Sequence, residues 1–134
     1  MRRPAGPWTD TIHGLLRHVR ANGLTEAPEP LGRDAEGREV LAFIPGAVHG
    51  YPMPGWMWGD AVLVAAAELL RRYHDATAGF APPDAHWRLP RREPVEVVCH
   101  SDFAPYNLVF RGRALVGVID FDTASPGPRA WDLA

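Results

Sequence analysis

The chain has 134 residues, 46% hydrophobic and 22% charged, which is typical of one modest globular domain and excludes a disordered protein. Its formal net charge of −2 provides no basic field for nucleic acid and no polybasic patch for a membrane surface. The single cysteine, Cys99, excludes an internal disulfide framework and suits a reducing compartment.

The longest apolar run, residues 61–67, is too short to span a bilayer, and the N-terminus lacks the apolar stretch of a signal peptide. We therefore expect a cytoplasmic protein with no nucleic-acid or membrane partner, and the sequence leaves its oligomeric state open. All 14 lysine-plus-arginine residues are arginine. The chain has neither of the two common glycine-rich phosphate loops, so a phosphate must be held by arginine, a metal or residues outside this chain.

The first predicted element is a short amphipathic helix. Thr9 and Asp10 are expected to cap it, its apolar side chains repeat at helical spacing over residues 12–19, and Gly23 is expected to stop it. The segment 27–37 is dense in proline, glycine and charge, which predicts a loop with a turn over residues 34–37.

The middle of the chain predicts a strand and a longer helix. Residues 39–44 form an apolar run that predicts a buried strand, stopped by Pro45-Gly46. After an irregular aromatic segment, Asp60 is expected to cap a helix over residues 61–77, with an apolar stripe at helical spacing and arginines near its C-terminal end.

The last third predicts strands around a polar loop. A proline-rich loop over residues 81–94 precedes a strand in 'VEVVCH', and 'SDFAPYN' follows as a loop. A hairpin is predicted over 'LVF-RGR-ALVGVID', with its turn at residues 111–113. The segment after it, 'TASPGPRAWDLA', predicts a loop that enters the first turn of a helix.

Oxygen-bearing side chains gather beside this hairpin. Asn107 comes just before its first strand and Asp120 just after its second, so pairing of the strands brings the two residues together. A carboxylate and an amide oxygen are suitable ligands for Mg²⁺, which keeps sites for water and phosphates. Asp102, five residues before Asn107, places a second carboxylate there to orient a hydroxyl and accept its proton.

Each of these residues taken singly is a common turn or capping residue. Together they form a specific pattern, H-x-D-x-x-x-x-N followed by a hairpin and I-D-F-D, which favours a functional site over isolated structural roles. Asp122 belongs to the same run, and a metal role for it stays open.

'HSDFAPYN' followed by 'VIDFD' resembles the catalytic and metal-binding segments of the aminoglycoside phosphotransferase and choline kinase-like family, relatives of protein kinases. 'EVLAFIPG' is similar to the hinge strand that receives adenine, 'AAAELLRRYHDAT' to the helix before the catalytic loop, and 'WDLA' to the start of the following helix. The resemblance implies an α+β, protein-kinase-like fold. It implies one partial domain over residues 1–134, with an N-lobe remnant and hinge at about 1–45 and a C-lobe core at about 46–134.

The resemblance also implies roles for individual residues. Asp102 is the implied catalytic aspartate, Asn107 and Asp120 are the implied Mg²⁺ ligands, and ATP or GTP is the implied phosphate donor. Supporting and nucleotide-binding roles fall on His100 and Asp132, which would brace the catalytic loop, and on Phe43, Ile44 and Arg3, which would meet the nucleotide. For Asp132 a helix N-cap is an equal alternative.

Three departures from the family pattern are visible. The glycine-rich loop with its strands is absent, and the phosphate-gripping lysine has only Arg2 or Arg3 near its place. No glutamate lies in the first helix to pair with that basic residue, and His13 is a candidate by location alone. The family's acceptor-binding helices would follow the last residue, so we expect a kinase-like protein truncated at both ends.

The expected function is transfer of the γ-phosphate of ATP or GTP to a hydroxyl of a small molecule, with an aminoglycoside-like, choline-like or sugar-like acceptor. The alternative is a catalytically inactive kinase-like fragment that serves as a binding or interaction module. A metal-dependent phosphohydrolase, indicated by His74-Asp75 with His100 and Asp120, is disfavoured because its motif is short and His74 falls near a helix end.

Overall fold

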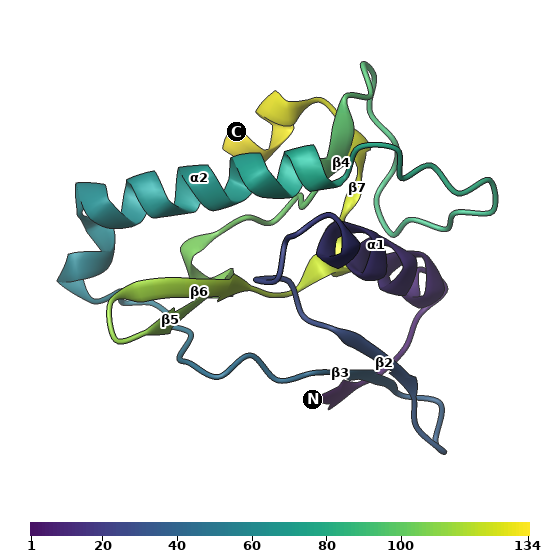
Figure 1. Ribbon diagram of the computed structural model, residues 1–134, viewed down its shortest axis with the longest axis horizontal. Coiled ribbons are helices and arrows are strands. Elements are labelled where there is room, and N and C mark those ends of the chain that lie inside the picture. The colour runs from purple at the N-terminus through teal and green to yellow at the C-terminus, as the bar shows by residue number, and fades with distance from the viewer.

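The computed structural model describes residues 1–134 and places two α-helices against three small antiparallel sheets (Figure 1). The longer helix, α2 (Asp60–Ala76), crosses one side of the molecule, and α1 (Thr9–Ala21) lies between it and the N-terminal strands. The α+β class predicted from the sequence is confirmed. Neither α-helix combines the length and the hydropathy that crossing a bilayer requires.

Three N-terminal strands form the first sheet, in the order β1 (Arg2–Arg3), β3 (Glu39–Leu41) and β2 (Pro30–Arg33). The prediction of a loop over residues 27–37 is wrong where β2 lies, although the turn is confirmed by the bond from the Gly37 amide to the Asp34 carbonyl, 3.0 Å. Pro30 and Gly32 make the sequence of β2 look like a loop. Proline cannot donate a ladder hydrogen bond, and Gly32 lies at a β-bulge with φ +104°.

The predicted strand over residues 39–44 is also too long, because β3 ends at Leu41. Both neighbours stop there: Leu41 pairs with Pro30 at the start of β2, and its carbonyl accepts the N-terminal amine of Met1 at 2.7 Å. Beyond this point the chain turns toward the hairpin, where Ala47 bridges to Phe110. Phe43 is consequently 71% exposed and not a buried strand residue.

The helices begin slightly differently from the prediction. Thr9 and Asp60 are the first residues of their helices and not caps, since Trp8 and Gly59 precede them and no side chain caps either N-terminus. The hydroxyl of Thr9 accepts the Gly6 amide at 2.9 Å. Gly23 follows α1 with φ +95°, as a helix stop requires.

The core lies between the two helices and the hairpin. The apolar face predicted for α1 is confirmed, with each of its four side chains at most 1% exposed. On α2 only the C-terminal part of the predicted stripe is buried, since Leu63 is exposed. The central buried side chains are Ile12, Leu15, Leu16, Val19, Leu69, Leu70, Tyr73, Phe110, Val118 and Phe121.

The C-terminal half carries two strand pairs. The hairpin is confirmed as β5 (Leu108–Arg111) and β6 (Ala114–Val118), with Gly112 at φ +62° in its turn. The strand in 'VEVVCH' is β4 (Val97–Cys99). It pairs with β7 (Ser125–Gly127), which lies where the sequence predicted only loop.

Short 3₁₀ turns complete the chain, at Gly55–Trp58, Pro105–Asn107, Phe121–Thr123 and Arg129–Leu133. The last of these replaces the α-helical turn expected at 'WDLA'. Pairing of β7 with β4 brings this final turn next to β4, as Figure 1 shows near the C-terminus.

Candidate active site

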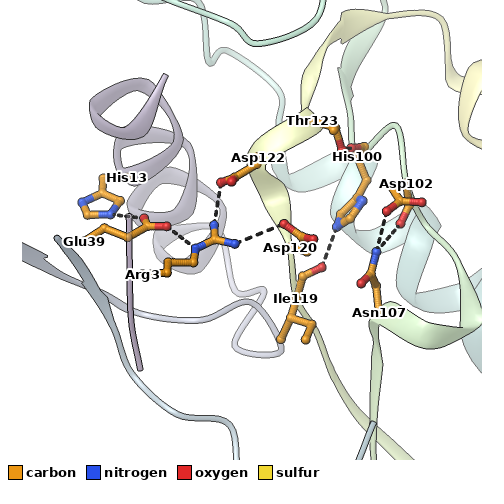
Figure 2. Close-up of polar contacts among 10 residues, drawn as sticks. All are labelled: Arg3, His13, Glu39, His100, Asp102, Asn107, Ile119, Asp120, Asp122 and Thr123. Carbon is orange, nitrogen blue, oxygen red and sulfur yellow. Dashed lines mark hydrogen bonds and ion pairs between the residues drawn. The ribbon is translucent and has the colours of Figure 1, made fainter. Parts of the chain in front are cut away.

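The loop between β4 and β5 closes on the carboxylate of Asp102. The Tyr106 hydroxyl donates to Asp102 Oδ1 at 2.7 Å. Asn107 Nδ2 donates to Asp102 Oδ2 at 2.9 Å (Figure 2). Asn107 Nδ2 also reaches the backbone carbonyl of Asp102 at 2.9 Å. The hydrogen bond to Asp102 raises the pKa of Tyr106 above its ordinary value. Asp102 is thus held in one orientation by its own loop.

The hairpin brings Asn107 and Asp120 to one place, as its strand pairing predicted. The backbone amide of Ile119 donates to the Asn107 carbonyl at 2.9 Å, so Asp120 follows immediately beside Asn107. The Asn107 side chain is buried, and its Nδ2 donates hydrogen bonds to Asp102. Its amide oxygen accepts no hydrogen bond from the protein. That oxygen remains available to a ligand.

Two residues of the site hold a left-handed backbone that residues other than glycine rarely adopt. Asp120 has φ +65° and ψ +66°, and Ser101, directly before Asp102, also has φ +65°. Such a conformation costs roughly 1–2 kcal/mol per residue. These are the chain's only non-glycine residues with positive φ, and strain of this kind gathers at functional sites.

Arg3 connects the N-terminal sheet to the hairpin (Figure 2). Its guanidinium contacts Glu39 of β3, Asp120 at 3.1 Å and Asp122 at 2.5 Å. Glu39 is only 2% exposed, and its second oxygen lies 2.9 Å from His13 Nε2. The sequence interpretation, which found no carboxylate partner for this arginine, is therefore wrong. The acidic residue in a buried strand was the available signal, because a buried carboxylate needs a partner.

Negative charge is only partly compensated around Arg3. Burial by itself lowers the pKa of Arg3, but the carboxylates of Asp122 and Glu39 outweigh it and raise that pKa. The pKa of Asp122 is raised, first by burial and then by Glu39 and Asp120, although Arg3 opposes the shift. Three carboxylates that share one guanidinium favour a further cation at the exposed one, Asp120.

His100 braces the loop from inside. It is fully buried, its ring packs 4.7 Å from that of Phe121, and its Nε2 lies 3.1 Å from the Ile119 carbonyl. Burial lowers its pKa, so the ring is neutral and donates from Nε2 to that carbonyl. This bond links His100, which precedes Ser101, to Ile119, which precedes Asp120.

Asp132 holds the backbone of the same loop. Its carboxylate accepts the amides of His100 at 2.9 Å and Ser101 at 2.7 Å, and it lies 2.7 Å from His74 Nε2. Burial raises the pKa of Asp132, but His74 and the two amides prevail and lower it. The alternative N-cap role is wrong, because the final turn begins after Pro128 and Asp132 lies inside it.

An apolar cavity of about 200 Å³ lies between the segment that follows β3 and the hairpin. Phe43 and Ile44 lie in its wall with Val109 and Ile119, and Ile119 directly precedes Asp120. A second hollow, about 170 Å³, lies at Asp102 and includes Trp131. Larger cavities lie elsewhere and are lined by neither Asp102 nor Asp120. The candidate site is therefore identified by its polar side chains and not by cavity volume.

The donor set fits Mg²⁺ better than a metal held wholly by protein. No group of three or more His, Cys, Asp or Glu side chains is arranged to hold a metal ion. Mg²⁺ takes few protein ligands and keeps water and phosphate oxygens. The free amide oxygen of Asn107 and the half-exposed carboxylate of Asp120 suit that chemistry.

Comparison with known proteins gives two kinds of match. Residues 83–134 match the model of the phosphotransferase enzyme family. The chain is 42% identical over 140 residues to the trifolitoxin immunity protein of Rhizobium leguminosarum bv. trifolii, which covers 98% of this chain and 52% of that protein. It is 28% identical over 169 residues to a homoserine kinase of Granulibacter bethesdensis, covering 96% of this chain and 51% of the kinase.

A homoserine kinase of Zymomonas mobilis is 47% identical over 51 residues, which cover 38% of this chain and 15% of that kinase. The chain thus spans about half the length of the first two relatives. The family match includes the segment 'HSDFAPYN', the hairpin and Asp132. These matches confirm the resemblance of 'HSDFAPYN' and 'VIDFD' to segments of a phosphotransferase family.

Proposed function

We propose that this chain carries the catalytic and metal-binding part of a phosphotransferase that moves the γ-phosphate of ATP or GTP to a hydroxyl of a small molecule. The observation that carries the proposal is the convergence of three oxygen-bearing side chains at one end of the hairpin. Asp102, Asn107 and Asp120 meet there beside two strained backbone positions and an apolar cavity.

In this proposal Asp102 orients the acceptor hydroxyl and takes its proton. Mg²⁺, when bound, supplies positive charge to the phosphates and would be held by Asn107 and Asp120. Arg3, which contacts Asp120, would bind the α- and β-phosphates in place of the lysine that the chain lacks.

The proposed division into lobes includes a place for the nucleotide base. Residues 1–45 would be the N-lobe remnant and hinge, and residues 46–134 the C-lobe core. The flat apolar ring of a purine suits the cavity at Phe43 and Ile44, with nearby backbone groups available to its polar edge.

For the acceptor, the hollow at Asp102 offers a carboxylate and the aromatic ring of Trp131. Two of the relatives above are homoserine kinases, so a small hydroxy amino acid is the first acceptor to test. Aminoglycoside-like, choline-like and sugar-like alcohols complete the panel.

The direct test is ADP or GDP release from Mg²⁺-ATP or Mg²⁺-GTP with each acceptor. The control is Asp102→Asn, which keeps the shape of the side chain and removes its ability to take a proton. We expect acceptor-dependent turnover that falls by about 10²-fold or more in Asp102→Asn, since general bases contribute about 10²–10⁴-fold. Equal turnover in a folded Asp102→Asn protein would contradict the role of Asp102.

A second candidate function rests on the 42% identity to the trifolitoxin immunity protein over 98% of this chain. In this reading the chain protects a cell from a toxin by binding, as a catalytically inactive kinase-like module. Expression of the wild type and Asp102→Asn in toxin-sensitive cells separates the two. Protection retained in Asp102→Asn favours binding, and protection lost in the folded variant favours catalysis.

A further inference from the structure

Tyr106 stands apart from the other two tyrosines of the chain. Its hydroxyl donates to Asp102 Oδ1 at 2.7 Å while the residue is 40% exposed. The hydroxyl of Tyr73 is buried without a partner, and the exposed Tyr51 makes no side-chain hydrogen bond to a carboxylate. Tyr106 alone joins a solvent-accessible phenol to the proposed catalytic carboxylate.

That hydrogen bond is the one an acceptor must make. In phosphoryl transfer, the acceptor hydroxyl donates to the catalytic aspartate, which orients it and takes its proton. Asp102 has two carboxylate oxygens, and Oδ2 is already bound by Asn107 Nδ2 at 2.9 Å. The remaining oxygen, Oδ1, is the one that Tyr106 occupies. The phenol therefore stands in the position of an acceptor hydroxyl.

The local backbone keeps the phenol there. Tyr106 lies in the 3₁₀ turn Pro105–Asn107, which is closed by the bond from the Asn107 amide to the Ala104 carbonyl at 2.9 Å. The Ala104 amide bonds in turn to the Asp102 carbonyl at 2.8 Å. The Tyr106 ring meets Tyr51 edge-on, with centroids 6.3 Å apart. Because Asn107 follows directly, the phenol is fixed next to the proposed metal ligand.

We propose that Tyr106 is a self-phosphorylation site of this protein, a proposal that rests on the proposed phosphotransferase function. The Tyr106 oxygen forms a bond to the γ-phosphorus of the nucleotide while the bond from that phosphorus to the β–γ bridging oxygen breaks. The nucleoside diphosphate leaves with the electron pair of that bond. The phenolic proton passes to Asp102 Oδ1 and from there to water.

Phosphorylation of Tyr106 closes the site. The phosphate adds about −1.5 to −2 charges next to Asp102. It takes the space at Oδ1 that a small-molecule hydroxyl needs, so the modified chain no longer accepts an acceptor. A small acceptor and Tyr106 compete for the same carboxylate oxygen, and a good acceptor therefore slows the modification.

The test is incubation of the full chain with Mg²⁺-ATP, followed by intact-mass measurement and peptide mapping of the phosphate. We expect one phosphate on Tyr106, formed at a rate independent of protein concentration. Tyr106→Phe and Asp102→Asn are expected to lose it. Tyr51→Phe removes a neighbouring exposed tyrosine and is expected to keep it.

Several results would overturn the proposal. They are an absence of phosphate on Tyr106, full labelling of Asp102→Asn, or a rate that rises with protein concentration. Thermal unfolding with Mg²⁺-ATP separates the two proposals. Nucleotide binding without phosphate on Tyr106 would contradict self-phosphorylation alone. Absence of both nucleotide binding and phosphate on Tyr106 would contradict the proposed phosphotransferase function as well.

The hydrogen bond has a nucleotide-free readout. In protein labelled with ¹³C at the tyrosine ring carbon that bears the hydroxyl, the Tyr106 resonance should differ from that of free tyrosine. It should move toward the free value in Asp102→Asn, while the Tyr51 resonance stays in place. A Tyr106 resonance unaffected by Asp102→Asn would overturn the proposed position of the phenol.

Discussion

Asp132 and Asp120 flank the same loop and hairpin but have opposite surroundings. The side chain of Asp132 is 0% exposed, and its carboxylate receives two backbone amides and His74. The side chain of Asp120 is 48% exposed, its backbone is left-handed, and Arg3 is its one side-chain partner. The oxygens of Asp132 are occupied by hydrogen-bond donors of the protein, whereas those of Asp120 can still accept further hydrogen bonds or bind a cation.

The difference distinguishes a carboxylate that stabilises the backbone of the site from one that is available to bind a ligand. A buried carboxylate whose oxygens are filled by the protein stabilises one backbone arrangement and has nothing left for a ligand. An exposed carboxylate held in a strained conformation adds little to folding and keeps its oxygens available. Asp132 therefore belongs to the fold and Asp120 to the proposed chemistry, and the two predict different mutational signatures.

The largest expected effect is that of Asp132→Ala. It removes the acceptor of three hydrogen bonds and leaves His74 and two loop amides without their partner. We expect the free energy of unfolding to fall by about 3–5 kcal/mol, as for other broken buried pairs. Urea unfolding followed by circular dichroism measures it. A fall of less than about 1 kcal/mol would show that Asp132 does not hold the loop.

The pH dependence of stability sharpens the same point. Because the pKa of Asp132 is lowered in the folded chain, its contribution is fully present above the unfolded value of about 3.9 and is lost as pH falls through the lower folded value. Asp132→Asn removes this contribution. Between pH 5 and pH 3, taken as roughly one unit either side of the unfolded pKa, the wild type should lose more stability than Asp132→Asn. An equal loss of stability in the two proteins would contradict an ionised Asp132 carboxylate stabilised by its hydrogen-bond donors.

A smaller effect is expected from the left-handed backbone at Asp120. With φ at +65°, Asp120→Gly relieves strain that Asp120→Ala keeps. We expect the glycine variant to be more stable than the alanine variant by about 1 kcal/mol. The matched pair removes the same carboxylate, so the contact with Arg3 cancels. Equal midpoints in urea would indicate that the backbone relaxes at no cost.

The smallest effect is expected for the stability of Asp120→Asn. Asparagine tolerates the left-handed conformation, and Arg3 keeps its contacts with Glu39 and Asp122. The free energy of unfolding should change by less than about 1 kcal/mol, as is usual for half-exposed ion pairs. A larger fall, comparable with that of Asp132→Ala, would show that Asp120 is structural after all.

How well the sequence predicted each region follows from the distance along the chain. Asp102 and Asn107 are five residues apart, and a hairpin joins Asn107 to Asp120, so local spacing was sufficient to bring them together. Arg3 meets Asp122 across 119 residues and Glu39 across 36, and no periodic pattern encodes such a meeting. Its carboxylate partners were therefore missed.

The missed strands have a chemical reason. β2 contains Pro30 and Gly32, and β7 contains Pro126, residues that usually mark loops because proline cannot donate a ladder bond. Both strands are edges of small sheets, where one missing donor is tolerated. Pairing of β7 with β4 then positions Asp132, whose carboxylate accepts the Ser101 amide, in keeping with the loop-bracing role that the resemblance implied for it.

Asp120 is proposed to be reserved for a metal-bound nucleotide, and one measurement tests this role directly. The measurement is thermal unfolding of the wild type and Asp120→Asn, each with and without Mg²⁺-ATP. At a hundredfold excess over Kd, binding should stabilise the wild type by about 2.7 kcal/mol, and Asp120→Asn should unfold unchanged by the nucleotide. An equal shift in both proteins, or no shift in a cooperatively folded wild type, would contradict the role assigned to Asp120.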